Sequence, residues 1–267
     1  MSRVLKLTLA YDGTAYVGWQ RQAAGVSIQG LVEDALTRLD GAPVAVHGAG
    51  RTDAGVHAFG QVASARVSTA HEPIVVRRAL NAILPGDIRV LEVEDVAPDF
   101  HARYHAAGKI YEYRIWQGDV QPPFARAWSW HLPRPLDVAA MDRAARMLEG
   151  RHDFSAFQSA GSAVRSAVRT VTSARAGVRE PGEDVAGEPG ATGRGQFVFV
   201  RIAADGFLRH MVRAIAGSLV EVGDARRDAE SVAAMLNLRD RAASGATAPA
   251  HGLILVRVMY PAPPAGP

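Results

Sequence analysis

Hydrophobic and polar residues alternate over several short stretches of the chain, a pattern typical of half-buried strands. Leu5, Leu7 and Leu9 fall on one face of the first stretch, whereas Lys6 and Thr8 fall on the other. Comparable runs of apolar and alternating residues predict further strands over residues 44–47, 61–67, 88–93, 110–116, 170–176, 197–202 and 253–260.

Apolar residues spaced three and four positions apart predict helices between these strands. Ser27 is a suitable N-cap for a helix over residues 28–39, and Pro73 suits the first turn of a helix that ends near Ile83. Similar stripes predict helices over residues 136–148, 207–222 and 231–238. Strands that alternate with helices and long connections indicate an α+β fold whose helices cover sheet faces.

A change in the pattern near Gly108 divides the chain into an N-terminal portion, residues 1–106, and a C-terminal portion, residues 107–267. Both portions run strand, helix, strand with added strands and turns, and no internal repeat is evident. The stretch from Glu180 to Gly195 is rich in Gly, Pro, Glu and Asp and lacks large apolar side chains. We therefore predict a flexible surface loop there, joining the two strands of a hairpin.

The composition limits the class of protein. Of 267 residues, 48% are hydrophobic and 21% are charged, so a packed core is expected. The absence of cysteine excludes disulfides and thiolate metal sites and fits a reducing cytoplasm. No apolar run reaches membrane-spanning length, and the N-terminus has no signal-peptide core, so a cytoplasmic protein without a membrane partner is expected. The net charge of +3, carried mainly by arginine, weakly favours a nucleic-acid partner.

The most informative segment is the glycine-rich stretch from Gly48 to Ala58, which carries a single carboxylate, Asp53. That carboxylate can serve as a nucleophile or a general acid or base, but an aspartate in such a loop can equally well stabilise a turn. Arg51 and His57 beside it are candidate contacts for a phosphate or a base. No second acid stands at a convincing position, which disfavours the carboxylate pair of a glycosidase.

Two residues of the C-terminal portion are further candidates. Arg213 is the sole positive charge of the almost wholly apolar stretch from Met211 to Val222; it either pairs with a carboxylate or lies at the exposed edge of the helix. Tyr111 either stacks on a nucleotide base or packs in the core with Tyr113. The histidines show no metal-ligand spacing, and the glycines around Ala49 lack the rest of a nucleotide-binding motif, so no metal or cofactor is expected.

Residues 50–58, Gly-Arg-Thr-Asp-Ala-Gly-Val-His-Ala, resemble the active-site motif of the tRNA pseudouridine synthase family that modifies positions 38 to 40. Further segments resemble the family's sequence in order along nearly the whole chain. They are residues 11–22, 80–85, 109–113, 152–157, 168–171, 206–213 and 249–253.

This resemblance implies a pseudouridine synthase fold, in which two similar α/β portions with mixed, mostly antiparallel sheets join around a central cleft. It implies a homodimer that needs no cofactor and isomerises uridines 38, 39 and 40 in the anticodon stem-loop of tRNA. Asp53 is then the catalytic nucleophile, and Tyr111 contacts the target base. Arg213 pairs with the aspartate, and Arg51 helps to displace the target nucleotide.

Two other functions remain open at this point. A non-catalytic tRNA-binding or RNA-folding protein would share the arginine-rich composition but would never isomerise its RNA. A nucleoside or glycoside hydrolase would release a free base or sugar, although it lacks the second acid. Within the isomerase hypothesis, the sequence does not distinguish attack of Asp53 at the sugar C1′ from attack at the uracil C6.

Overall fold

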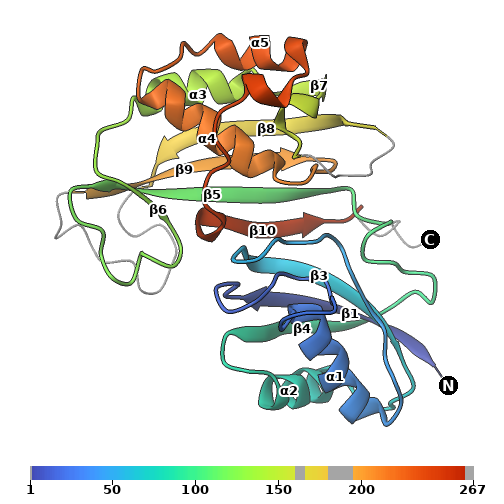
Figure 1. Ribbon diagram of the computed structural model, residues 1–267. Helices are drawn as coiled ribbons and strands as arrows, with labels where there is room; N and C mark the ends of the chain where they lie inside the picture. Colours follow the sequence, from blue (N-terminus) through green and yellow to red (C-terminus); the bar gives the residue numbers. More distant parts are fainter. Residues whose placement is uncertain (1, 160–165, 180–194, 262–267) are drawn as a thin grey trace. The chain divides into compact units, whose positions relative to one another are not determined.

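The computed structural model describes residues 2–159, 166–179 and 195–261 (Figure 1). Within them the chain forms two compact units. The first comprises the chain up to Lys109 together with the segment from Leu255 onward, and the second runs from Ile110 to Ile254. The prediction from the sequence places the boundary after residue 106 and the closing strand, residues 253–260, in the second portion. In the structure, most of that strand belongs to the first unit.

The first unit contains an antiparallel sheet with the strand order β4-β1-β3-β10, and β2 pairs with β3. Its elements are β1 (Arg3–Tyr11), α1 (Ile28–Asp40), β2 (Val46–Gly48), β3 (His57–Val67), α2 (Pro73–Ile83), β4 (Ile88–Val96) and most of β10 (Leu253–Met259). Leu5, Leu7 and Leu9 of β1 are completely buried, as their alternation predicts.

The ends of the two helices in this unit follow from local chemistry. The Ser27 hydroxyl accepts a hydrogen bond from the Gly30 backbone N–H and caps α1, and Gly41 ends the helix with a left-handed φ of 76°. Pro73 occupies the first turn of α2, where a missing N–H costs nothing. The predicted bounds of both helices are confirmed to within one residue.

The second unit has the strand order β5-β9-β8-β7, with β6 pairing in parallel to β5. Its elements are β5 (Gly108–Gly118, of which the first two residues belong to the first unit), β6 (Trp130–Leu132), α3 (Val138–Arg146), β7 (Gly150–Asp153), β8 (Val168–Val178), β9 (Gly195–Ala204), α4 (Met211–Gly223) and α5 (Ser231–Leu238). Short 3₁₀ turns cover Ser155–Phe157, Arg241–Ala243 and Ala250–Gly252. Helices α3, α4 and α5 lie together beside this sheet (Figure 1).

Several predictions about the second unit need correction or qualification. Helix α4 begins at Met211 rather than at residue 207, because His210 adopts a left-handed φ of 62° that interrupts the helix. Strands β6 and β7 were not predicted, since β6 is only three residues long and β7 shows no apolar alternation. Strands β8 and β9 pair antiparallel as a hairpin, whereas residues 180–194 of the predicted loop lie outside the described residues.

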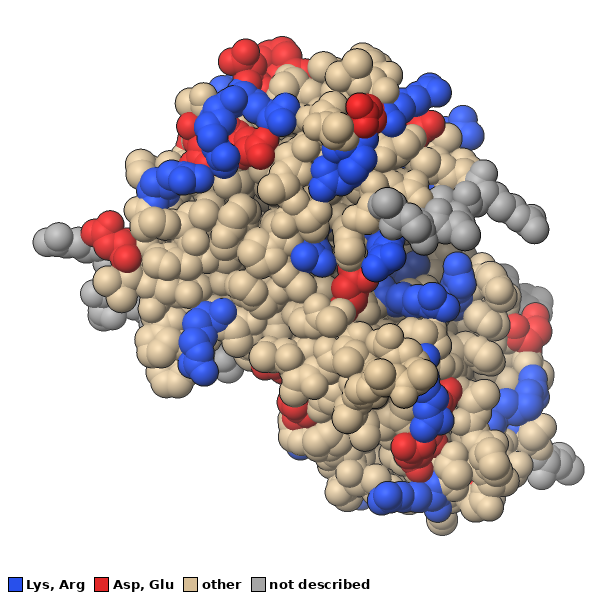
Figure 2. Space-filling model, viewed as in Figure 1, with Lys and Arg blue, Asp and Glu red and all other residues tan. Residues whose placement is uncertain are grey.

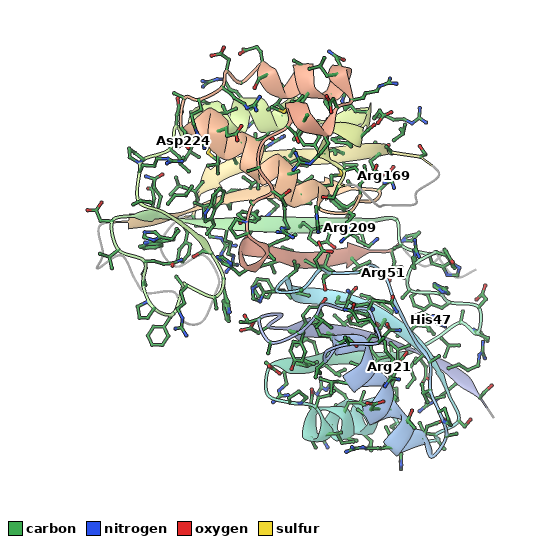
Figure 3. All side chains as sticks on the ribbon, in the orientation of Figure 1. Arg21, His47, Arg51, Arg169, Arg209 and Asp224 are labelled. Carbon is green, nitrogen blue, oxygen red and sulfur yellow. The ribbon has the colours of Figure 1, made fainter. Side chains whose placement is uncertain are left out.

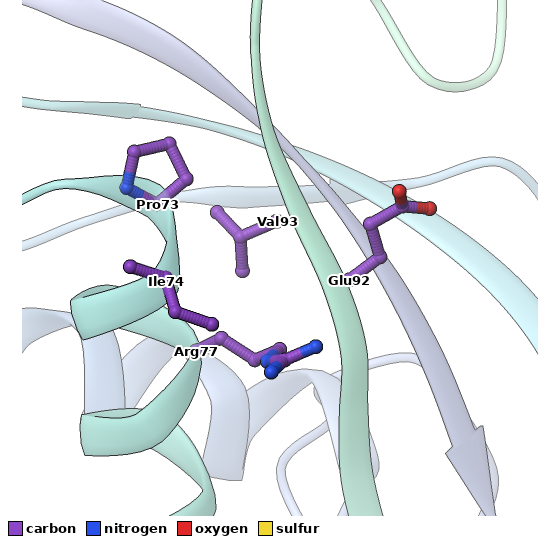
Figure 4. Close-up of a pocket in the computed structure, with 5 residues that line it drawn as sticks. All are labelled: Pro73, Ile74, Arg77, Glu92 and Val93. Carbon is purple, nitrogen blue, oxygen red and sulfur yellow. The ribbon is translucent and has the colours of Figure 1, made fainter.

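The α+β class with a mostly antiparallel sheet is confirmed, since only the β5–β6 pairing is parallel among those assigned a direction. In the described part of the chain, no helix is both long and apolar enough to cross a membrane. A hollow between α2 and β4 is lined by Pro73, Ile74, Arg77, Glu92 and Val93 (Figure 4), none of them a predicted site residue.

Candidate active site

Asp53 lies in the loop between β2 and β3, and backbone hydrogen bonds fix that loop on both sides. The Ala49 N–H donates to the Val62 carbonyl at 2.7 Å, and the Trp19 N–H donates to the Thr52 carbonyl at 3.0 Å. Asp53 itself forms an isolated β-bridge with Gly18, and its carbonyl accepts from the Val56 N–H at 3.1 Å. The half-buried Asp53 therefore sits on a well-anchored loop.

Glycines let the segment that follows β1 approach this loop backbone to backbone. A Cβ atom added at Gly18 would lie 2.5 Å from the Thr52 carbonyl oxygen, and Gly18 has a φ of 106° that side chains rarely allow. A Cβ at Gly13 would lie 2.1 Å from the Val56 carbonyl oxygen. The resemblance to the family's N-terminal segment thus has a physical basis, because this segment supports the Asp53 loop.

A buried polar network lies beneath the same loop. The Tyr11 hydroxyl lies 2.8 Å from Thr52 Oγ1, and the Gln61 side-chain amide donates to the Gly50 carbonyl at 2.9 Å. Burial raises the pKa of Tyr11 to about 12, although its hydrogen bonds to Thr52 and Gln61 oppose the shift. Tyr11 therefore stays protonated at neutral pH and serves as a support for the loop.

The two neighbours of Asp53 that the sequence suggested as RNA contacts differ in exposure. His57 is only 3% exposed, and its Nδ1 accepts a hydrogen bond from the Gly13 N–H at 3.1 Å. Its suggested contact with a phosphate or a base is therefore wrong, because the ring faces the interior. Arg51 is exposed, and its Nε donates to Gln20 Oε1 at 3.0 Å, which orients the guanidinium at the surface (Figure 3).

Basic residues do not form a continuous coat on the face of the molecule that Figure 2 shows. Figure 2 shows Lys and Arg side chains interspersed with acidic ones and with wide neutral areas.

Tyr111 lies on β5 in the second unit and is largely buried. Its ring meets the Phe207 ring edge to face, with centroids 4.9 Å apart and planes at 76°. Tyr113 is completely buried, and its hydroxyl donates to the Pro249 carbonyl at 2.8 Å. Burial raises the pKa of Tyr113, and the positive charge of Arg213 opposes this shift.

Arg213 lies in the first turn of α4 and is half-buried. Its Nε donates to the Ala248 carbonyl at 2.7 Å, and the Ala248 N–H donates to the Arg213 carbonyl at 3.1 Å. Burial lowers the pKa of the neighbouring His251. A hydrogen bond with the Ser129 backbone raises this pKa, and the positive charge of Arg213 lowers it. The guanidinium is thus held by the segment before β10, next to a neutral imidazole.

The four predicted site residues divide between the two compact units. Arg51 and Asp53 share one loop of the first unit, and Tyr111 and Arg213 belong to β5 and α4 of the second. The described residues include no group of three His, Asp or Glu side chains arranged to hold a metal ion.

Sequence reasoning missed several residues that support these four. Gln61 and Thr52 brace the Asp53 loop, and Phe207 packs against Tyr111. Phe207 could have been found from the sequence, because it stands in a segment, residues 206–213, that resembles the family. Gln61 could not have been found, since a polar residue in a strand gives no sign that its side chain reaches a backbone carbonyl of the preceding loop.

We expect Gly18→Ala to destabilise the protein by roughly 3 kcal/mol, because the substitution adds both φ strain and a close contact with the Thr52 carbonyl. Gly41→Ala is the matched control, since Gly41 has a φ of 76° but nothing within 4 Å of an added Cβ. That control should cost about 1 kcal/mol. Denaturant unfolding measures both, and equal losses would show that the close approach to the Asp53 loop is unimportant.

Comparison with known proteins agrees with the resemblance of the motifs. The tRNA pseudouridine synthase family matches residues 8–105 and 144–261. The tRNA pseudouridine synthase A of Moorella thermoacetica is 48% identical over 262 residues, which cover 96% of this chain and 99% of that protein. Those of Solidesulfovibrio magneticus and Myxococcus xanthus are 48% and 45% identical, covering 97% and 96% of this chain and 92% and 91% of their own lengths. The chain belongs to the tRNA pseudouridine synthase family.

Proposed function

We propose that this protein isomerises uridine to pseudouridine at positions 38, 39 and 40 in the anticodon stem-loop of tRNA, with Asp53 as the covalent catalyst. The observation that carries the proposal is Asp53 itself, the carboxylate of the family's motif, on a loop that glycines and backbone hydrogen bonds hold in place. The identity to tRNA pseudouridine synthases A over nearly the whole chain supports the substrate class.

The substrate must first be made accessible. A uridine in a stem is stacked and paired, so it has to turn out of the helix before a side chain can reach it. In our proposal, Arg51 contacts the phosphate backbone as the nucleotide leaves the stem, and Tyr111 packs on the displaced base. The exposed guanidinium of Arg51 and the edge-to-face support of Tyr111 by Phe207 suit these roles.

The reaction then rearranges one bond. Asp53 adds to the sugar C1′ or to the uracil C6, and the bond between N1 and C1′ breaks. The uracil turns so that C5 faces C1′, the new carbon–carbon bond forms, and the carboxylate leaves. The proton lost from C5 is balanced by one gained at N1, so the product is an isomer of the substrate. A site closed to water protects the intermediate from hydrolysis.

Arg213 supplies positive charge to the reaction in this proposal. An ionised carboxylate that is partly removed from water needs a cationic or hydrogen-bonding partner. The hydrogen bond from Arg213 Nε to the Ala248 carbonyl fixes the side chain, and the neutral His251 beside it adds no competing charge. We also propose that the protein acts on tRNA in the cytoplasm as a homodimer and needs no cofactor, as the resemblance implies.

Mapping of pseudouridine in tRNA from a strain that lacks this gene tests the proposed substrate positions. We expect pseudouridine to disappear at positions 38, 39 and 40 and to remain elsewhere. Restoring the gene should restore the modification, whereas the Asp53→Asn gene should not. A tRNA pool that keeps all three modifications in the deletion strain would refute the proposal.

Tyr111→Ala should reduce kcat/KM by about a hundredfold, more than it weakens tRNA binding. The reason is that the target base is the one part of the tRNA that the ring is proposed to contact. Tyr111→Phe retains the ring and its contact with Phe207, so it separates the role of the hydroxyl from that of the ring. Single-turnover kinetics and tRNA binding measure the two effects. Equal loss of activity and binding in Tyr111→Ala would contradict a specific role at the target base.

A further inference from the structure

A row of rings lies on the first unit, outside the residues assigned to catalysis. The His47 and His101 rings stack with centroids 5.1 Å apart and planes at 26°, and the His101 and Tyr104 rings follow at 4.3 Å and 33°. The Arg103 guanidinium lies 6.0 Å from the centre of the Tyr104 ring. Tyr104 is 76% exposed, so most of its ring is open to solvent. We call these four residues the aromatic strip.

The strip is built into the fold. His101 Nδ1 accepts hydrogen bonds from the Arg103 and Tyr104 backbone N–H groups at 3.1 and 3.4 Å, which fixes the central ring. Between them, Ala102 donates its N–H to Ser64 Oγ on β3, and its carbonyl accepts from the Tyr260 hydroxyl. Burial lowers the pKa of His101, and the neighbouring His47 lowers it further, so the ring stays a neutral acceptor at neutral pH.

The strip continues toward the Asp53 loop through Lys109. A Cβ atom added at Gly50, in the same loop as Asp53, would lie 3.0 Å from Lys109 Cε, so this side chain lies over the loop. Burial lowers the pKa of Lys109, and the positive charge of Arg103 lowers it further. The two cations are therefore close enough to repel each other.

These cations differ from others in the same unit. Arg3 pairs with Asp95, Lys6 pairs with Glu94, and Arg21 pairs with Glu33 and Asp34. Within residues 2–159, 166–179 and 195–261, neither Arg103 nor Lys109 forms an ion pair. Positive charge that pairs with no carboxylate of the described residues, beside an open aromatic face, fits an anionic ligand that carries a flat ring.

We propose that the aromatic strip and Lys109 bind a nucleotide of the tRNA other than the target uridine, with its base on Tyr104 and its phosphate at Arg103 and Lys109. Stacking on an exposed ring beside cations is the general mode by which proteins hold unpaired nucleotides, and it tolerates any base. This proposal rests on the proposed function, because it takes the bound RNA to be the tRNA that the protein modifies. A second copy of this chain fits less well, since two such surfaces facing each other would bring like charges together.

Binding of an unmodified tRNA transcript to the Asp53→Asn protein tests this proposal without turnover. In that background, Tyr104→Ala should raise the Kd about tenfold through lost stacking, whereas Tyr104→Phe should stay within about twofold. Phe124→Ala is the matched control, because Phe124 is 80% exposed and lies outside the strip. Arg103→Ala should reduce the slope of log Kd against log salt by about one, and Arg78→Ala, which removes an exposed arginine on α2, should not.

Two results would overturn the proposal. One is a Kd for Tyr104→Ala no different from that of Phe124→Ala. The other is a Tyr104→Ala variant that changes its oligomeric state by light scattering yet binds tRNA normally, which would identify the strip as a contact between copies. If wild-type protein binds tRNA through the strip but makes no pseudouridine, the proposed function fails while the strip assignment stands.

Discussion

The Asp53→Asn variant is expected to lose pseudouridine formation by about a thousandfold or more, because an amide cannot replace a carboxylate as a nucleophile. The substitution keeps the shape of the side chain. The backbone contacts that anchor the loop, the bridge to Gly18 and the hydrogen bond from Val56, do not involve the carboxylate. We therefore expect the variant to fold and to bind tRNA with a Kd within about threefold of wild type.

Asp34→Asn is the matched control for this experiment. Asp34 is an exposed aspartate on α1 that pairs with Arg21 at the surface, so its loss should leave activity unchanged. Activity is measured in single turnover with excess enzyme, which removes any effect of product release. Substantial pseudouridine formation by Asp53→Asn would refute the assignment of Asp53 as nucleophile, whatever the behaviour of the other residues.

The largest effect on stability is expected at Glu112, the carboxylate between Tyr111 and Tyr113 on β5. Its side chain is completely buried and receives hydrogen bonds from Arg114 at 2.9 Å, Arg179 at 2.7 Å and Arg201 at 2.6 Å. Glu112→Ala removes a carboxylate that all three guanidinium groups contact. We expect a loss of about 3–5 kcal/mol in the free energy of unfolding, because the largely buried Arg114 and Arg179 lose this partner while their charges stay in the interior.

The same cluster predicts a pH dependence. Burial alone would raise the pKa of Glu112, but the charges of Arg114 and Arg179 and the hydrogen bonds from Arg201 and Arg114 outweigh it and hold the pKa below its usual value. A lowered pKa in the folded state means that the stabilisation is present above the unfolded value of about 4.3 and is lost as pH falls through the folded pKa. The stability advantage of wild type over Glu112→Gln should therefore shrink at acidic pH.

Unfolding of both Glu112 variants by denaturant at several pH values measures these effects. Asp34→Ala is the surface control and should cost less than about 1 kcal/mol. A Glu112→Ala protein as stable as this control, or a wild-type advantage that is unchanged at acidic pH, would show that the cluster contributes little to folding.

Much of the fold can be predicted from the sequence where local chemistry decides it. Ser27 and Pro73 mark helix starts because their preferences act over a few residues, and the leucines of β1 alternate because one face of the strand is buried. The start of α4 could not be predicted, since the left-handed backbone of His210 reflects tertiary contacts that include Ser159. Strand β7 was missed because its Gly-Arg-His-Asp sequence has no apolar pattern.

In the candidate site, too, local features could be predicted and contacts between distant segments could not. Asp53 was found because its motif is rich in glycine and resembles a known family. The structure gives two of those glycines a reason, since Gly55 has a φ of 77° and a Cβ atom at Gly48 would lie 2.4 Å from Trp19 Nε1. The burial of Glu112 was missed, because alternation along β5 places it on the polar face and reveals neither Arg201 on the adjacent β9 nor Arg179 after β8. The stacking of His47 on His101 likewise depends on a contact between distant segments.

Incubation of the purified protein with an unmodified tRNA transcript, followed by mapping of pseudouridine at single-nucleotide resolution, tests the central claim most directly. The transcript carries uridines at positions 38 to 40 and elsewhere, and no cofactor is added. We predict pseudouridine at positions 38, 39 and 40 with wild type and none with Asp53→Asn. Release of free uracil, modification only at other positions, or tRNA binding without any pseudouridine from wild type would contradict the proposed function.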